Sequence, residues 1–152
     1  MEGHVLGDHL EYNQITEYIY IGTNQCCQIN VAQELLQEGI RAIISLEEDR
    51  SDTPFGVDYY LWLPTTNDTA PTQQQLQVGS DFISQLVQLK QKVYVHCMLG
   101  HGRAPTLVVA YLISTGLTVE QAISQVVARR PVVHLNDAQM RALNEFADLA
   151  RS

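Results

Sequence analysis

Hydrophobic and polar residues follow two different periods along this chain. The first pattern is typical of strands. Apolar and polar positions alternate over residues 15–21, which is the period of a strand, and short apolar runs cover residues 41–46, 57–63 and 92–96. We interpret the runs at 41–46 and 92–96 as buried strands, because strands covered on both faces are apolar throughout. The pattern therefore predicts a sheet of about four to five strands.

The second period is helical, and it appears between the strand-like segments. Helical spacing of apolar residues predicts helices over residues 29–38, 72–91, 104–114 and 118–130. Thr118 and Gln121 form a capping-box pattern at the start of the last of these, and Pro131 ends it. We expect one more helix towards the end of the chain, capped by Asn136 or Asp137.

Strands that alternate with helices form a mainly parallel sheet with helices on both faces. We therefore predict an α/β fold with a mainly parallel central sheet of about four to five strands flanked by helices. Neither a linker-like segment nor a repeat divides the sequence, so residues 1–152 are expected to form a single domain. Ligands bind such sheets at the carboxyl ends of the strands, which points to the loop after Val95.

The segment at residues 95–106 carries the candidate chemistry. Gly100 and Gly102 allow successive backbone N–H groups to turn inward as an anion-binding nest, and the following helix N-terminus adds positive potential. Arg103 offers a planar fork for two oxygens of a tetrahedral anion. Cys97 lies at the start of this positive cup, where a thiolate is favoured over a thiol. A nucleophile and an anion cradle thus share one turn.

Composition and charge exclude several classes of function. The chain is 45% hydrophobic, and its 9 Lys+Arg against 17 Asp+Glu give a formal net charge of −8. This balance argues against binding to bulk nucleic acid or to anionic membranes. The longest strongly apolar run, residues 107–113, is too short for a membrane-spanning segment. Residues 1–12 lack the basic and apolar regions of a signal peptide, so we expect none.

The three cysteines do not form a disulfide framework, because their number is odd. We do not expect the adjacent Cys26 and Cys27 to pair with each other. We interpret both as partly buried thiols in a reducing, cytoplasmic setting, and the alternative is a protective disulfide with Cys97 on oxidation. His4 and His9 have no matching carboxylate or cysteine cluster, so neither a metal nor a cofactor is expected.

Four residues of the 95–106 segment carry a resemblance to a known family. His96, Cys97, Gly100 and Arg103 match the pattern His-Cys, five residues, Arg, with a Gly three residues after the Cys. The chain resembles the cysteine-dependent protein tyrosine phosphatase superfamily and looks most like its small dual-specificity phosphatases. A weaker similarity extends from residue 15 to the final helix. The resemblance implies a protein tyrosine phosphatase-like fold.

The resemblance also implies a mechanism that needs no metal. Cys97 attacks phosphorus to form a cysteinyl-phosphate, while His96 orients the loop and helps to keep Cys97 ionised. The phosphoryl oxygens are held by the Arg103 side chain and by backbone N–H groups of the loop. These phosphate-binding residues are Met98, Leu99, Gly100, His101, Gly102 and Arg103.

The family carries its general acid as an Asp on a loop upstream of the signature. Residues 64–71 follow a predicted strand and precede a predicted helix, and Asp68 is the only carboxylate among them. The Asp-x-Ala-Pro run that begins at Asp68 looks like the family's acid loop, so we assign the acid to Asp68. Asp58, within a predicted strand, is the fallback.

Several positions depart from the family or have two interpretations. Ala104 replaces the usual Ser or Thr, whose hydroxyl helps the thiolate to leave the phosphoenzyme, and Thr106 is the nearby hydroxyl. His101 either favours a second acidic group on the substrate or is an exposed loop-tip histidine. Arg130 either meets a second phosphate at the rim or is a helix-end cation, and Asn136 either supports the loop or caps a helix.

The leading interpretation is a phosphomonoesterase that acts on phosphotyrosine, and on phosphoserine or phosphothreonine, in a phosphoprotein or phosphopeptide. The alternative is a phosphatase for a phosphoinositide, a phosphoglycerolipid or an RNA 5′-phosphate, against which the acidic charge and the absence of loop lysines count. A third interpretation, favoured by Ala104, is a catalytically weak phosphate-binding scaffold. We expect no nucleic-acid partner and no membrane segment.

Overall fold

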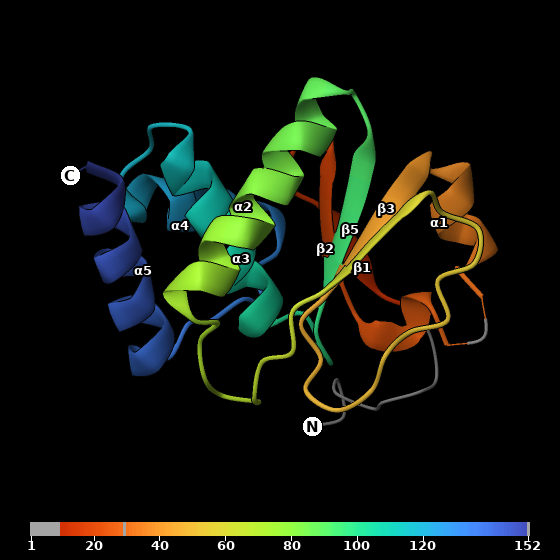
Figure 1. The fold of residues 1–152 in the computed structure, drawn as a ribbon, viewed down its shortest axis with the longest axis horizontal. Coiled ribbons are helices and arrows are strands. Elements are labelled where there is room, and N and C mark those ends of the chain that lie inside the picture. The colour runs from red at the N-terminus through yellow and green to blue at the C-terminus, as the bar shows by residue number, and fades with distance from the viewer. Residues whose placement is uncertain (1–9, 29, 152) are drawn as a thin grey trace.

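The computed structural model describes residues 10–28 and 30–151, and its centre is a five-stranded sheet (Figure 1). The strands are β1 (Tyr12–Gln14), β2 (Ile19–Gly22), β3 (Ile40–Ser45), β4 (Tyr59–Trp62) and β5 (Lys92–His96), in the spatial order β1-β2-β5-β3-β4. The expectation that His4 and His9 bind no metal concerns residues outside the described ranges. The expectation of no signal peptide concerns residues 1–12, most of which also lie outside them.

The sheet confirms the predicted α/β class, because every pairing except that of β1 with β2 is parallel. The pairing register places Gly22 of β2 and Ser45 of β3 on either side of His96 in β5. The carboxyl ends of three strands therefore meet at one edge. The antiparallel strand β1 is an addition to the predicted elements, and its three residues are too few to show a periodic pattern.

Helices cover both faces of the sheet (Figure 1). One face carries α2 (Gln73–Gln88), α3 (Arg103–Ser114), α4 (Val119–Arg129) and α5 (Asp137–Arg151), and the other carries the 3₁₀ turn η2 (Asn24–Cys26) and α1 (Gln33–Gln37). Residues 29–38 were expected to be one helix, but α1 is shorter. Val31 and Ala32 donate their backbone N–H groups to Phe55 and Cys26, so these residues are held outside the helix.

Two apolar clusters hold the layers together. The larger lies under α2–α5 and includes almost all of α3, which is buried along its whole length except at its C-terminal end. The smaller lies under α1 and packs Tyr20, Leu35 and Tyr94 around the buried Cys26 and Cys27. A fully covered β5 followed by a fully buried α3 gives the connecting loop two rigid supports.

Capping residues fix where the helices begin. The predicted box of Thr118 and Gln121 is present at α4, and Thr72 and Gln75 form a second box at α2. Both boxes satisfy N–H groups that the first helical turn leaves without partners. Among the residues that the structure describes, no helix is both long enough and apolar enough to cross a bilayer.

Candidate active site

The loop between β5 and α3 forms the floor of a pocket of about 250 Å³. Cys97 is only 3% exposed and Arg103 only 4%, yet both side chains line this pocket. Four other loop residues assigned to phosphate binding line it as well, namely Met98, Leu99, His101 and Gly102. The structure therefore brings the predicted nucleophile, the predicted guanidinium and much of the loop to one cavity.

The backbone of the loop depends on its two glycines. Gly100 has a φ of 72°, and a Cβ there would lie 2.8 Å from the carbonyl oxygen of Gly22. Gly102 is the N-cap of α3, and a Cβ there would lie 2.8 Å from Nε2 of Gln139. Because the first N–H groups of a helix have no partner within it, those of α3 offer donors and positive potential beside the pocket.

Arg103 is anchored on one edge only. Its Nη1 donates to the carbonyl oxygen of Thr65 at 2.8 Å and to that of Leu46 at 3.3 Å. Within residues 10–28 and 30–151, its Nε and Nη2 groups donate to no protein acceptor. A guanidinium held on one edge presents its other N–H groups to the pocket in a fixed orientation, as bidentate binding of a tetrahedral anion requires.

His96 is fully buried beneath Cys97. Its Nδ1 lies 3.0 Å from the Cys97 carbonyl oxygen, and its Nε2 lies 2.6 Å from Oδ2 of Asp52. Because a carbonyl oxygen only accepts, Nδ1 carries a hydrogen, and a further proton lies between Nε2 and Asp52. This arrangement fits the predicted orienting role. Asp52 was not identified from the sequence, because only the fold brings it to His96.

Arg130 does not line the pocket, so the rim interpretation is wrong, and the residue lies at the C-cap of α4, as the helix-end interpretation has it. The side chain is fully buried behind the loop, where it donates to the carbonyl oxygens of Leu99 at 2.8 Å and Gly100 at 2.9 Å. Its other N–H groups bond Asn13 and the carboxylate of Glu11. The position at the end of α4 does not reveal this, because β1 supplies the partners.

The segment that follows β2 contacts the loop once and is itself tied to β5. The backbone N–H of Asn24 donates to the carbonyl oxygen of Met98 at 3.1 Å. Tyr94 of β5 donates its hydroxyl to the carbonyl oxygen of Thr23 at 2.7 Å. Burial raises the pKa of the Tyr94 phenol well above its usual value, so the hydroxyl keeps its proton and stays a donor.

Asp68 lines the same pocket and is exposed. Its φ of 65° is in the left-handed region, and its carbonyl oxygen accepts a hydrogen bond from Nδ2 of Asn136 at 2.9 Å. Asn136 also caps α5, since its Oδ1 accepts from the N–H of Gln139 at 2.9 Å. Asn136 therefore caps a helix, as one interpretation has it, and its other side-chain contact is with the Asp68 loop rather than with the Cys97 loop.

The fallback acid, Asp58, is not at the pocket. It lies just before β4 rather than within it, and its backbone N–H donates to Arg41. Because β4 runs parallel to β3 and β5, its start lies at the sheet edge opposite to the Cys97 loop. Strand direction thus distinguishes the two carboxylates in a way that their spacing in sequence does not.

Thr106 and Ala104 lie in the first turns of α3 and are both fully buried. The Thr106 hydroxyl donates to the carbonyl oxygen of Gly102 at 2.7 Å. Thr106 therefore supports the loop backbone, and its hydroxyl is already committed to an acceptor other than the Cys97 sulfur. The position of Ala104 carries no hydroxyl of its own.

The sequence interpretation missed three residues of the pocket, namely Asn67, His134 and Gln139. His134 lies beside His101, with ring centroids 5.9 Å apart, and its backbone N–H donates to the His101 carbonyl oxygen at 3.1 Å. Gln139 was detectable, because it stands three residues after Asn136 in a capping-box pattern. For His134 no sequence signal exists, since the approach of its loop to His101 is tertiary.

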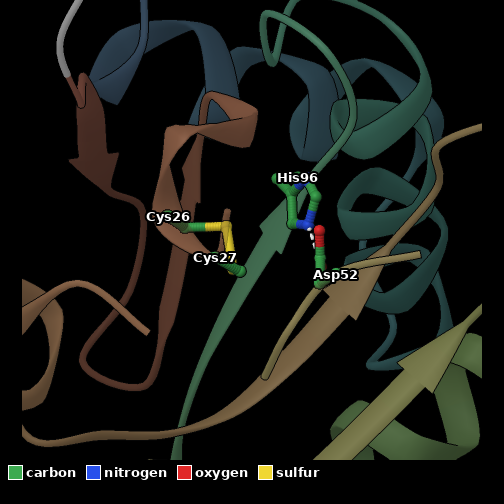
Figure 2. Close-up of side chains that lie close together, drawn as sticks. All are labelled: Cys26, Cys27, Asp52 and His96. Carbon is green, nitrogen blue, oxygen red and sulfur yellow. Dashed lines mark hydrogen bonds and ion pairs between the residues drawn. A yellow bond between two sulfur atoms is a disulfide. The ribbon is translucent and has the colours of Figure 1, made fainter. Parts of the chain in front are cut away.

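Cys26 and Cys27 form a disulfide with each other, so the expectation that they do not pair is wrong (Figure 2). Cys26 ends the turn η2, and Cys27 follows with a φ of −146° and a ψ of 34°, a local geometry in which both side chains lie on the same side. Both residues are fully buried, more completely than expected. Cys97 is a free thiol.

Comparisons with known proteins agree with this geometry. The family described as "Dual specificity phosphatase, catalytic domain" matches residues 19–148. The chain is 33% identical over 131 residues to "Phosphatidylglycerophosphatase and protein-tyrosine phosphatase 1" of Homo sapiens, covering 77% of this chain and 64% of the relative. It is 30% identical over 146 residues to "Phosphatidylglycerophosphate phosphatase PTPMT2" of Arabidopsis thaliana, covering 91% and 63%. The chain thus spans less than two thirds of these relatives.

A solved structure extends the similarity to three dimensions. The structure titled "Crystal Structure of PTPMT1 in complex with PI(5)P" superimposes with a TM-score of 0.79 at 26% identity, and the match covers 92% of this chain and 96% of that one. That protein was solved with a phosphoinositide. The arrangement of sheet and helices is therefore shared with a phosphatase-like protein whose ligand is a lipid phosphate.

Proposed function

The chain belongs to the dual specificity phosphatase catalytic-domain family, and we propose that it is a cysteine-dependent phosphomonoesterase. One observation carries the proposal: Cys97 and Arg103, both almost completely buried, line the same pocket as Asp68. A nucleophile, an anion-binding fork and a carboxylic acid are what the two-step hydrolysis of a phosphate monoester requires. Retention of all three argues against a purely binding scaffold.

In the first step, the Cys97 thiolate attacks phosphorus and the bond from phosphorus to the leaving oxygen breaks. Asp68 gives its proton to that oxygen, so the product leaves as an alcohol. The Nε and Nη2 groups of Arg103, together with the backbone N–H groups of the loop, hold the phosphoryl oxygens while charge spreads over them. The result is a cysteinyl-phosphate.

In the second step, Asp68 is ionised and accepts a proton from water, whose oxygen attacks phosphorus. The sulfur–phosphorus bond breaks, inorganic phosphate leaves, and Cys97 returns to the thiolate. His96 donates to the Cys97 carbonyl oxygen and so keeps the start of the loop in one orientation through both steps. Arg130 acts from behind by fixing the Leu99 and Gly100 carbonyl oxygens.

For the substrate, we propose the phosphate monoester of a hydroxyl-rich lipid headgroup, of the phosphatidylglycerophosphate kind. The names of the human and Arabidopsis relatives support this class. The pocket supports it too, because His101 of the loop lines it together with Asn67, His134, Asn136 and Gln139 from other segments. These side chains can hydrogen-bond the hydroxyls of glycerol.

The same lining argues against phosphotyrosine as the preferred substrate. Within the part of the chain that the structure describes, none of the pocket residues is aromatic apart from the two histidines. A tyrosyl ring gains most from stacking against apolar or aromatic side chains, and this pocket offers few. The formal net charge of −8 opposes a strongly anionic bilayer, but it does not prevent a single headgroup from reaching Arg103.

A protein substrate remains the second candidate function, supported by the family and by the second half of the human relative's name. The deciding experiment compares three substrates at equal concentration, all in EDTA. They are short-chain phosphatidylglycerophosphate below its micelle concentration, a phosphotyrosyl peptide and a phosphoseryl peptide. Phosphate release measures kcat/KM for each, and we expect the lipid to exceed both peptides by about tenfold or more, equivalent to one good hydrogen bond.

The Cys97→Ser variant separates the two parts of the proposal. A serine hydroxyl is a weak nucleophile without an adjacent base, so turnover of every substrate should fall by about 10⁴-fold or more. Substantial turnover by this variant would reject the cysteine mechanism itself. A wild-type preference for a peptide would reject only the lipid assignment and would restore the protein-directed interpretation.

A further inference from the structure

We propose that Cys26, Cys27, Asp52 and His96 bind one Zn²⁺ ion when the Cys26–Cys27 disulfide is reduced. The four residues lie behind the catalytic loop, outside the pocket that holds Cys97 (Figure 2). The proposal concerns a second site and does not depend on the phosphatase activity. Figure 2 shows the sulfur atoms and the Asp52 carboxylate lying close to the His96 ring.

The donor set and its spacing suit zinc. One ligand atom from each residue lies within 4.8 Å of every other, and both cysteines and His96 are fully buried. Two thiolates, an imidazole and a carboxylate are all zinc ligands in tetrahedral sites. Bond lengths of about 2.0–2.3 Å place such ligands roughly 3.3–3.8 Å apart, so shifts of about 1 Å bring these four into place.

Asp52 provides an independent indication of a missing partner. Its side chain is 1% exposed, and its Oδ1 makes no hydrogen bond within the described ranges 10–28 and 30–151. A buried carboxylate oxygen without a partner is unfavourable, because it has lost its hydration and gained nothing in return. A cation bound by this oxygen would remove that deficit.

His96 already has the orientation of a metal-binding histidine. Such residues typically donate one ring N–H to a backbone carbonyl or a carboxylate and coordinate the metal through the other nitrogen. Here Nδ1 donates to the Cys97 carbonyl oxygen, and Nε2 is the nitrogen that faces Asp52. Zinc bound by Nε2 and by the Asp52 carboxylate would displace the proton that the two groups share, with a small movement of Asp52 away from the ring, and would leave the bond to Cys97 in place.

The chemical step balances with a thiol reductant. Two thiols give two electrons and two protons to the disulfide, which yields the Cys26 and Cys27 thiols and an oxidised disulfide of the reductant. Zn²⁺ then displaces both thiol protons and the proton between Nε2 and Asp52, so three protons are released. The ion is held by two thiolates, one carboxylate and one neutral imidazole, with a net charge of −1 at the site.

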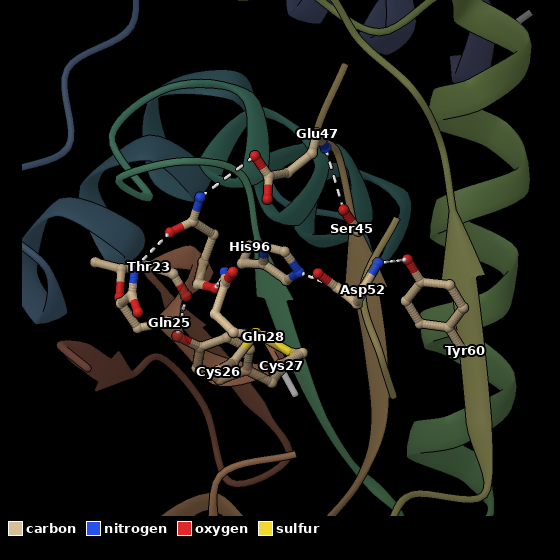
Figure 3. The surroundings of a disulfide bond; sticks show 12 residues. Thr23, Gln25, Cys26, Cys27, Gln28, Ser45, Glu47, Asp52, Tyr60 and His96 are labelled. Carbon is tan, nitrogen blue, oxygen red and sulfur yellow. Dashed lines mark hydrogen bonds and ion pairs between the residues drawn. A yellow bond between two sulfur atoms is a disulfide. The ribbon is translucent and has the colours of Figure 1, made fainter. Parts of the chain in front are cut away.

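A cavity of about 490 Å³ lies beside the segment that carries the cysteines, and its walls include Gln25, Gln28, Glu47 and Arg50. Figure 3 shows Gln25, Gln28 and Glu47 in the surroundings of the disulfide. None of the four proposed zinc ligands lines this cavity, and Glu47 is paired with Arg50 at 3.2 Å.

The test uses the full chain with Cys97→Ser, which removes the other thiol that can bind zinc. A phosphine reductant keeps Cys26 and Cys27 reduced without competing for the metal. Equilibrium dialysis against Zn²⁺ with elemental analysis should give about one ion per chain, and Co²⁺ should give the intense visible absorption of a tetrahedral thiolate site. After oxidation and removal of the reductant, the same protein should bind no zinc.

Variants on the same background locate the site. Replacing both cysteines by alanine should abolish zinc binding. Asp52→Asn should weaken it by more than about tenfold, because loss of an outer partner of a ligand already costs 10- to 100-fold. Asp58→Asn, an exposed carboxylate outside the cluster, is the matched control and should leave binding unchanged. Circular dichroism checks that each variant is folded.

A second readout keeps the test decisive if a variant does not fold. In the reduced wild-type chain, Zn²⁺ should slow alkylation of Cys26 and Cys27, as measured by mass spectrometry of their peptide. Zinc binding that survives loss of both cysteines, zinc binding by the oxidised protein, or the absence of both stoichiometric binding and protection would each overturn the proposal.

Discussion

Arg103 and Arg130 lie on opposite sides of one loop, and they are used in opposite ways. Both are nearly or completely buried, at 4% and 0% exposure. Arg130 bonds two loop carbonyl oxygens, the Glu11 carboxylate and Asn13, which engages every N–H of its guanidinium. Arg103 bonds protein acceptors through Nη1 alone in the described part of the chain, and it lines the pocket.

The difference shows how burial and function are to be separated. A buried guanidinium whose donors are all satisfied holds structure, because a ligand could bind only by breaking existing hydrogen bonds. A buried guanidinium that keeps unbonded N–H groups at a pocket can donate them to an anion. The back of the loop is thus built to be rigid and the front to be completed by substrate.

The largest effect on activity is expected for Arg103, on the pocket side of the loop. Arg103→Lys replaces a bidentate fork by a point charge, so kcat/KM should fall by about 10³-fold or more, on the scale of arginines that stabilise phosphoryl transfer. The melting temperature should change little. Steady-state kinetics and thermal unfolding measure the two quantities. Near-normal kcat/KM would mean that the Nε and Nη2 donors of Arg103 do not contribute to catalysis.

Asp68→Asn should have the next largest effect, about 10²–10⁴-fold on kcat, the usual scale for a positioned proton donor. The loss should be small for an aryl phosphate with a good leaving group and large for an alkyl phosphate, which needs protonation. Asp58→Asn is the control and should leave both rates unchanged, because Asp58 lies at the other end of the sheet. Equal losses on the two substrates would contradict the acid role.

At the back of the loop, Arg130→Met should act on stability. It leaves the Leu99 and Gly100 carbonyl oxygens without donors, each at a cost of about 1–3 kcal/mol. The Glu11 ion pair adds little, because the Glu11 side chain is 46% exposed. Urea unfolding should therefore show a loss of about 2–4 kcal/mol in the free energy of unfolding. An unchanged urea midpoint would mean that Arg130, like Arg103, is not needed for the stability of the fold.

The smallest effect concerns departure of the thiolate. Ala104→Ser supplies the hydroxyl that the family usually carries after the Arg, and one hydrogen bond from it to the thiolate corresponds to a gain of about tenfold in the steady-state rate. Rapid mixing of the wild type with an aryl phosphate should show a burst of phenol that the variant reduces. No burst and no rate change would show that phosphoenzyme breakdown does not limit turnover.

Thr106→Val sharpens the same point. Because the Thr106 hydroxyl already donates to Gly102, its loss should lower the free energy of unfolding by about 0.5–1.5 kcal/mol and leave the burst unaltered. A specific slowing of phosphoenzyme breakdown would instead mean that this hydroxyl turns towards the sulfur during the reaction.

Features that depend on neighbours along the chain could be predicted without a structure. The spacing from Cys97 to Arg103, the glycine at position 100 and the capping box at Thr118 are local, because turns and first helical turns are built from residues a few positions apart. The alternation of strands and helices likewise gave the parallel sheet and the edge at which the loop lies. These features were sufficient to find the front of the site.

The residues behind the loop could not be assigned before the chain was seen folded. Arg130 meets Glu11, and His96 meets Asp52, across long stretches of chain, and no local pattern encodes either pairing. An arginine can be a rim cation or a buried support, and what packs over it decides which. Here β1 and the residue before it pack over Arg130, and a strand of three residues is too short to show a periodic pattern in the sequence. Cys26 and Cys27 are adjacent in sequence, but their burial under His96 follows from packing of the turn η2 against the sheet.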